Sequence, residues 1–139
     1  PHLSEFYAGK DLGWYRNLST NSDYNTVEWA HLFTNPDYSN IVDMYEGGFY
    51  HTRGIYRSEA VSCMNNNIPY FSAISRQAIV ERIMDYAGEE FNLEDFYAND
   101  SDEFGATTRS VASEFTVESV YNGKQHTPVY MGDKPDFIK

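Results

Sequence analysis

The sequence is most informative at residues 46–57, which read E-G-G-F-Y-H-T-R-G-I-Y-R. Glycine adopts backbone conformations that other residues avoid, so the glycines of this stretch let the chain turn sharply or approach a ligand closely. Arg53 and Arg57 carry planar guanidinium groups that suit carboxylates or peptide carbonyls. The stretch is therefore either a binding loop or a packed turn in which the arginines neutralise acids such as Glu46 and Glu59.

The residues before this stretch have the composition of loops anchored by aromatic side chains. From residue 1 to about residue 40, polar clusters separate short aromatic groups around Trp14 and Trp29. An aromatic side chain buries a large area through few rotatable bonds, so we expect these groups to anchor irregular chain onto a core. Residues 41–45 are predicted to form a short strand or helical turn that ends at the two adjacent glycines.

The clearest helical pattern covers residues 76–87. Ser75 is a typical N-cap residue and Gly88 a typical C-terminal stop. Between them, apolar side chains fall on one face at helical spacing: Ile79, Ile83, Tyr86 and Ala87. We predict one amphipathic helix that docks this face on the core.

Residues 105–139 are predicted to form a C-terminal extension built on a β-hairpin. Strands at residues 114–121 and 125–131 flank Asn122-Gly123, which is typical of a type I′ turn. Pro128 places the second strand at the edge of a sheet. The sequence thus predicts an α+β fold that is rich in loops and contains few helices.

Size and charge restrict the possible partners. The chain has 139 residues, of which 41% are apolar and 17% aromatic, and its formal net charge is −11. This length predicts a single domain or sub-domain over residues 1–139. The negative charge repels polyanions, so no nucleic acid partner is expected. No stretch approaches the roughly 20 consecutive apolar residues that a membrane span needs, so no membrane span is expected.

Most of the negative charge is concentrated in one region. Eleven acidic residues lie from Glu81 to Glu118, against only Arg82 and Arg109. A solvated face is the simplest interpretation. A calcium loop is a weaker alternative, because the region lacks the EF-hand order of carboxylates, central glycine and closing glutamate. The alternating acids that suggest calcium are Asp100, Asp102 and Glu103.

Seven residues of the 46–57 stretch follow the order E-G-G/A-x-Y-x-x-x-G-x-Y-R: Glu46, Gly47, Gly48, Tyr50, Gly54, Tyr56 and Arg57. Cys63 and Met64 come soon after. This order resembles a motif of the immunoglobulin A peptidase-like family of zinc metallopeptidases, in which a proline and then C-x-M follow the arginine. Other stretches resemble that family's G-W-Y, W-x-H, Y-S-D-V-V and F-C-P-V-C-R-E-A-I segments: residues 13–15, 29–31, 38–42 and 71–79. The resemblance covers about residues 12–98, and an ordered run of this kind is more specific than one short motif.

The chain also departs from the family pattern. Ser72 and Ser75 stand where the family has the two cysteines of C-P-V-C, so Cys63 has no obvious disulfide partner. Ser58 replaces the proline after the arginine, and Glu28 stands where a proline often precedes the W-x-H tryptophan. These differences indicate a divergent branch.

The resemblance implies a metzincin-like peptidase domain in which zinc is held by an H-E-x-x-H helix. No H-E-x-x-H occurs in this chain, and in the family that motif lies upstream of the stretch resembled here. We therefore expect the chain to be the C-terminal segment of such a catalytic domain, with the zinc helix before Pro1. The resemblance further implies an exported parent, with zinc, a protein or peptide substrate and the N-terminal part of the parent polypeptide as partners. The isolated chain is expected to bind no zinc and to have no peptidase activity.

On this resemblance, the chain supplies the floor and wall of a substrate cleft. Met64 is the candidate for the methionine that lies beneath the metal, the alternative being an ordinary core methionine. Tyr56 and Arg57 are candidates for contacts to substrate carbonyls or to the developing oxyanion, and His51 and Arg53 are further substrate-binding candidates. The alternative for Arg57 is structural, in which it bridges the glycine turn to the acidic helix.

Two other functions fit the residues. The missing metal motif and the tyrosine-rich, acidic surface suit a non-catalytic binding or structural module. A cysteine hydrolase would use Cys63 as its nucleophile with a histidine partner. If the chain bound zinc after all, the histidines to suspect would be His31, His51 and His126.

Overall fold

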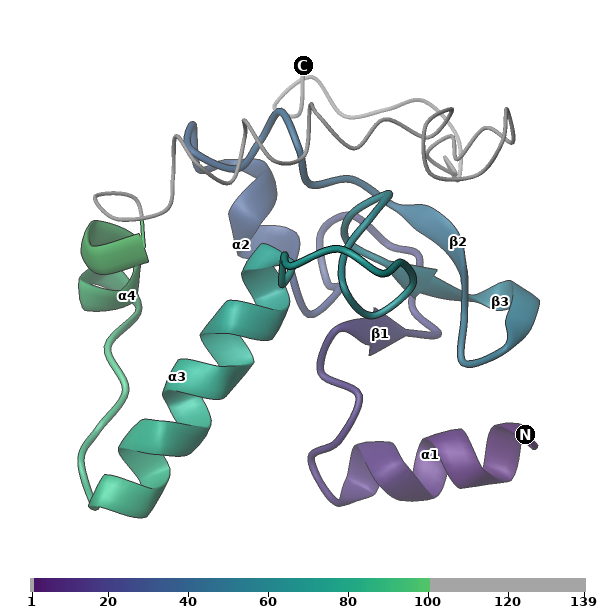
Figure 1. Ribbon diagram of the computed structural model, residues 1–139, viewed down its shortest axis with the longest axis horizontal. Coiled ribbons are helices and arrows are strands. Elements are labelled where there is room, and N and C mark those ends of the chain that lie inside the picture. The colour runs from purple at the N-terminus through teal and green to yellow at the C-terminus, as the bar shows by residue number, and fades with distance from the viewer. Residues whose placement is uncertain (1, 101–139) are drawn as a thin grey trace. The chain divides into compact units, whose positions relative to one another are not determined.

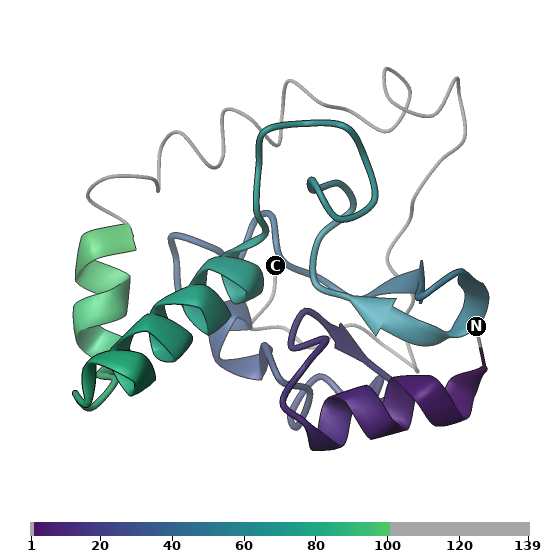
Figure 2. The same cartoon turned by 60° about the horizontal axis from the view of Figure 1, so that its bottom comes forward.

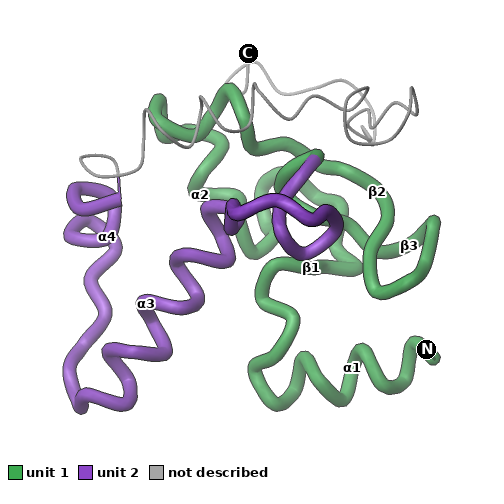
Figure 3. The backbone as a smooth tube through the Cα atoms, in the orientation of Figure 1, with its two compact units in different colours: residues 1–60, 126–139 green, residues 61–125 purple. Residues whose placement is uncertain are grey.

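A computed structural model describes residues 2–100 of the chain (Figure 1). The described elements are α1 (Leu3–Asp11), β1 (Leu18–Ser19), α2 (Ala30–Phe33), β2 (Tyr45–Gly48), β3 (His51–Arg57), α3 (Ala73–Ala87) and α4 (Leu93–Asp100). They fall into two compact units that meet in sequence between Ala60 and Val61 (Figure 3). The predicted α+β class is confirmed, since the described residues form a small fold with few helices and an antiparallel sheet.

The first unit is built on a three-stranded sheet in the order β1-β3-β2, with both pairings antiparallel. The 46–57 stretch supplies most of β2 and all of β3, so it forms a β-hairpin. The predicted stop at the two glycines is wrong, because β2 begins at Tyr45 and runs through both of them to Gly48. Glycine weakens a strand but does not exclude one, and here the partner strand holds both residues in the ladder.

Buried aromatic side chains anchor the irregular segments of the first unit, as the sequence predicted. Trp29 is fully buried and donates its indole N–H to the backbone carbonyl of Asp43, at 3.2 Å. The buried Tyr24 donates its hydroxyl to the carboxylate of the same residue, at 2.7 Å. The buried apolar residues include Leu32, Phe33, Tyr38, Val42, Met44 and Ile55. Trp14 departs from this pattern, because more than half of its side chain is exposed.

The first unit begins with a helix that the sequence did not predict. Residues Leu3–Asp11 form α1, which lies alongside the sheet (Figure 2). Its only buried residues are Phe6 and Gly9, and its large apolar residues Leu3, Phe6 and Tyr7 cover little more than one turn, which is too short a pattern to identify a helix. Phe6 packs on the ring of Phe49 in the hairpin turn, with ring centroids 5.4 Å apart. This contact, together with the hydrogen bonds of Lys10 to Leu18 and Glu28, holds the helix on the unit.

The second unit contains the predicted helix. It spans Ala73–Ala87, so it begins three residues earlier than expected, with Ser72 at the N-cap position and Ser75 inside the first turn. Gly88 ends it in the left-handed conformation, at φ 72°, as predicted. A second helix, α4, follows within the acidic region and was not predicted.

The predicted docking face of α3 is wrong. Ile79, Ile83 and Tyr86 are 44%, 59% and 81% exposed. The buried positions instead gather in the first turns of the helix: Ala73, Ile74, Ser75 and Gln77. Periodicity identified a helical face correctly, but it cannot tell which face meets the rest of the protein.

Several predictions concern residues beyond those described. The hairpin at 114–131, the 105–139 extension, and the candidate ligands Asp102, Glu103 and His126 lie outside residues 2–100. The single domain over residues 1–139 stays a prediction. Within residues 2–100, no helix is long and apolar enough to cross a bilayer.

Candidate functional site

The β2–β3 hairpin brings four of the candidate residues onto one element. Its register pairs Tyr45 with Arg57, Glu46 with Tyr56 and Gly48 with His51. The ladder is irregular between Glu46 and Gly48, where β3 contributes extra residues opposite β2. Phe49 and Tyr50 form the turn, and their φ angles of 49° and 60° are those of a two-residue hairpin turn of type I′.

Contacts among the motif residues shape the irregular part of the hairpin. The Glu46 carboxylate accepts a hydrogen bond from the backbone N–H of Gly54 at 3.0 Å, and Gly54 has a φ of 81°. A Cβ at Gly48 would lie 2.8 Å from Cδ2 of Leu18, so the leucine side chain would have to move to accept any other residue there. The contacts within this hairpin thus explain why Glu46, Gly48 and Gly54 occupy their positions in the motif.

The guanidinium of Arg57 holds the glycine turn in place. Its Nη1 donates to the backbone carbonyls of Glu46 and Gly47, at 3.0 and 2.8 Å. Its Nη2 donates to the carbonyl of Ala60 at 3.2 Å, and the group lies 5.9 Å from the ring centroid of Tyr45. Arg57 therefore holds the glycine turn, as one half of its structural alternative predicted, and the bridge from this turn to the acidic helix stays a prediction. Its predicted contact with substrate stays a prediction.

Tyr56 lies on the opposite face of the sheet from Arg57. The two residues are consecutive in the central strand, where β1 and β2 pair with both of them, and side chains alternate between the faces of a strand. Tyr56 is half-buried, and within residues 2–100 its hydroxyl has no hydrogen-bond partner. The Tyr56 hydroxyl therefore lies on one face of the sheet, and the Arg57 guanidinium, which bonds to the glycine turn, lies on the other.

His51 and Arg53 lie at the outer half of β3. The Nδ1 atom of the half-buried His51 is 2.8 Å from the carbonyl of Phe49, and the two rings are stacked. This contact leaves Nε2 as the nitrogen available to a ligand. Arg53 is exposed and makes no ion pair with any residue that the structure describes. Both side chains can therefore reach a partner in solution.

Met64 belongs to the second unit. It lies in a tight turn in which the backbone N–H of Asn65 donates to the carbonyl of Ser62, at 3.1 Å. Its side chain is 62% exposed, which rules out the ordinary core methionine that was its alternative. Its predicted place beneath a metal stays a prediction.

Cys63 is a free thiol at the start of the same turn. Burial raises the pKa of this thiol above its ordinary value, and a backbone hydrogen bond only partly opposes that. A raised pKa lowers the fraction of the nucleophilic thiolate at neutral pH. The environment of Cys63 therefore disfavours the cysteine hydrolase.

The side chains of residues 2–100 do not form a metal-binding group. No three His, Cys, Asp or Glu side chains in this range gather closely enough to hold an ion. His2 instead caps α1 by accepting from the backbone N–H of Ser4. Zinc ligands therefore cannot be assigned to residues 2–100.

An ion pair between Arg76 and Asp100 was missed by the sequence analysis. The guanidinium Nε and Nη2 of Arg76 donate to the two carboxylate oxygens of Asp100, at 2.7 and 2.8 Å. Burial disfavours the charged arginine, but the carboxylate outweighs that effect and raises the arginine pKa above its ordinary value. The residues are far apart in sequence and their pairing depends on α4, so no local pattern signals it.

Comparison with known proteins adds no family assignment. The chain matches no protein-family model, no curated protein and no solved structure significantly.

Proposed function

We propose that this chain is the C-terminal portion of a zinc-dependent endopeptidase that hydrolyses peptide bonds of protein substrates. The observation that carries the proposal is the ordered resemblance to immunoglobulin A peptidase-like enzymes over about residues 12–98. In this proposal the chain supplies the cleft floor and substrate wall of a metzincin-like domain. Upstream polypeptide supplies the H-E-x-x-H helix and the zinc, and the parent protein is exported to the periplasm, the cell surface or the medium.

The contacts within the hairpin support the proposal because they give the motif a physical reason. Glu46 holds Gly54, Arg57 holds the carbonyl of Gly47, and Gly48 makes room for Leu18. The matched residues thus have structural roles within a single hairpin, which is consistent with their occurring together in the sequence.

The same contacts divide the proposed roles between two kinds of residue. Arg57 acts as a positioning residue, since its Nη atoms are bonded to the backbone of the turn. Tyr56 is the proposed donor to a substrate carbonyl or to the oxyanion, because peptide hydrolysis places negative charge on that oxygen. His51 and Arg53 extend the substrate wall toward the tip of the hairpin.

The test of this division is Tyr56→Phe in the zinc-loaded parent enzyme. Loss of an oxyanion donor should lower kcat about 100-fold while leaving KM and the unfolding midpoint unchanged. Tyr50→Phe is the matched control, since that side chain is 93% exposed in the turn, and it should leave kcat unchanged. An unchanged kcat in Tyr56→Phe would remove Tyr56 from the catalytic machinery.

The alternative is a non-catalytic binding or structural module derived from the same family. It is suggested by the tyrosine-rich and acidic composition of the chain. The absence of a metal-binding group among residues 2–100 does not separate the two functions, because the peptidase proposal places the zinc ligands upstream. The two functions differ in what precedes Pro1 in the open reading frame. An H-E-x-x-H within about a hundred residues upstream supports the peptidase, and an unrelated domain there supports the module.

A further inference from the structure

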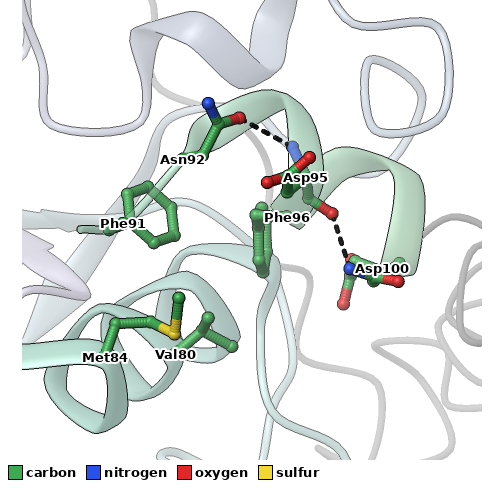
Figure 4. Close-up of a pocket in the computed structure, with 8 residues that line it drawn as sticks. Val80, Met84, Phe91, Asn92, Asp95, Phe96 and Asp100 are labelled. Atoms are coloured by element: carbon green, nitrogen blue, oxygen red, sulfur yellow. Dashed lines mark hydrogen bonds between the residues drawn. The ribbon is translucent and has the colours of Figure 1, made fainter. Parts of the chain in front are cut away.

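The second unit contains a pocket between α3 and α4 (Figure 4). Its volume is about 320 Å³, which is near the lower end of the range for small-ligand sites. Its apolar lining comes from both helices and from the segment that joins them: Val80, Met84, Phe91 and Phe96. The flexible thioether of Met84 lets such a lining adapt to different apolar groups. The pocket therefore has the size and surface to take one large apolar side chain.

Contacts at both ends of the two helices fix the walls of the pocket. At one end, Gly88 closes α3 with the paired backbone bonds of a Schellman motif, from Gly88 to Asp85 and from Glu89 to Met84. The Asn92 side chain then caps α4 by accepting from the N–H of Asp95. At the other end, the ion pair between Arg76 and Asp100 joins the two helices. A pocket fixed in this way costs little conformational entropy when a ligand binds.

The rim of the pocket is polar and negatively charged. Residues 85–100 contain six acidic residues and no lysine or arginine. Two of these acids, Asp95 and Asp100, line the pocket, and the charge of Asp100 is neutralised by Arg76. A partner with a positive charge next to its apolar group would complement this rim.

Two amides at the rim offer hydrogen bonds that suit a peptide. Asn92 uses its side-chain oxygen on the cap, and Asn99 uses its side-chain nitrogen on the carbonyl of Asp95. Within residues 2–100, the nitrogen of the first and the oxygen of the second have no hydrogen-bond partner. They provide one donor and one acceptor on exposed residues at the rim, which are the two kinds of group that the carbonyl and the N–H of a peptide bind.

We propose that this pocket binds a peptide segment in which a large apolar residue stands next to a lysine or arginine. The apolar side chain enters between Val80, Met84 and Phe96, and the cation lies against Asp95. Partners rich in phosphate are repelled by the same rim. Every residue used in this proposal lies in the second unit, and the proposed peptidase contacts of Tyr56, His51 and Arg53 lie in the first. Binding to the pocket therefore does not depend on peptidase activity.

The test is a titration of the isotope-labelled full chain, followed by nuclear magnetic resonance. The probe is the peptide acetyl-Ala-Leu-Lys-Ala-amide, and the comparison peptide has glutamate in place of lysine. We expect saturable amide shifts over residues 80–99 with the lysine peptide at millimolar concentration, and at least threefold weaker binding of the glutamate peptide. Equal affinity for the two peptides, or shifts that map elsewhere, would overturn the proposal.

Paired variants separate the pocket from its surroundings. Asp95→Asn should weaken binding of the lysine peptide about two- to fivefold, the effect of one exposed ion pair, and should reduce its salt dependence. Glu94→Gln removes the same charge from the same helical turn without lining the pocket, so it should have a smaller effect. Phe91→Ala should weaken binding, while Ile83→Ala, which changes an exposed side chain outside the pocket, should not. Equal effects within either pair would contradict the assigned site.

A third titration, with hexylamine in place of the peptide, tests whether the pocket recognises a peptide or any simple amine. Hexylamine carries an apolar chain and a cation but has no peptide unit for Asn92 and Asn99. The proposal predicts that it binds more weakly than the lysine peptide. If it binds as tightly, the pocket recognises amines in general and the peptide assignment is wrong.

Discussion

At the scale of single residues, the 46–57 stretch is an interlocked set rather than a row of separate candidates. The sequence identified the glycines and arginines as important and left open whether they bind a ligand or hold a turn. The structure shows Arg57 holding the turn and Gly54 in a left-handed conformation. The sequence could not show that Tyr56 and Arg57 lie on opposite faces, because that follows from the pairing of three strands.

The role of Arg57 as a positioning residue predicts the effect of a conservative change. Arg57→Lys keeps the charge but replaces a planar fork by a single ammonium group, which cannot reach all three carbonyls. We expect a loss of about 1–3 kcal/mol in the free energy of unfolding, measured by denaturant titration. Arg53→Lys is the control on the same strand and should change stability by less than about 0.5 kcal/mol. Equal stability of the two variants would mean that the fork is dispensable.

The ion pair between Lys10 and Glu28 predicts a pH dependence of stability. The lysine Nζ lies 2.6 Å from the carboxylate. Burial opposes ionisation of Glu28, but hydrogen bonds led by that from Lys10 outweigh it, so the pKa of Glu28 is lowered in the folded state. A lowered pKa stabilises the fold above the usual glutamate range and ceases to do so as the pH falls through the folded value.

Glu28→Gln should therefore be less stable than the wild type at pH 7, and the difference should shrink below about pH 4. Lys10→Met should show the same trend, because it removes the partner that lowers the pKa. The measurement is the free energy of unfolding of the three proteins between pH 3 and pH 7. A difference that stays constant across this range would show that the pair is not linked to folding.

At the scale of elements, prediction succeeded where a local signal exists. The end of α3 at Gly88 follows from the conformational freedom of glycine, and the sequence located it correctly. The helices α1 and α4 were not predicted because each is short, at 9 and 8 residues, and has apolar side chains at helical spacing over little more than one turn. The apolar face of α3 was assigned to the core, although Ile83 and Tyr86 are exposed. Tertiary contacts decide that assignment, and a single sequence does not contain them.

The α3–α4 pair depends on the ion pair between Arg76 and Asp100. Only 14% and 5% of these side chains are exposed, so removing one partner leaves a buried charge without its counter-charge. We expect Asp100→Asn to lower the free energy of unfolding by about 3–5 kcal/mol. Circular dichroism during denaturant unfolding measures the change. Arg82→Met, on the exposed part of α3, is the control and should lie within about 0.5 kcal/mol of the wild type.

At the scale of the whole molecule, the sequence predicted the α+β class but not the internal division of the chain. The two compact units meet in sequence between Ala60 and Val61. The composition of the chain does not change there, so nothing in the sequence marks this boundary. The proposed peptidase function depends on the ordered resemblance, and the hairpin gives that order a physical basis. The pocket of the second unit is proposed to bind a peptide whether or not the chain belongs to a peptidase.

We propose that this chain completes a zinc peptidase whose metal helix lies upstream. Mass spectrometry of the polypeptide expressed with the sequence that precedes Pro1 in its reading frame measures its zinc content and tests this proposal. We expect one tightly bound zinc per chain, lost when the histidines of an upstream H-E-x-x-H are replaced by alanine. If the longer polypeptide binds no zinc, the chain does not complete a zinc peptidase.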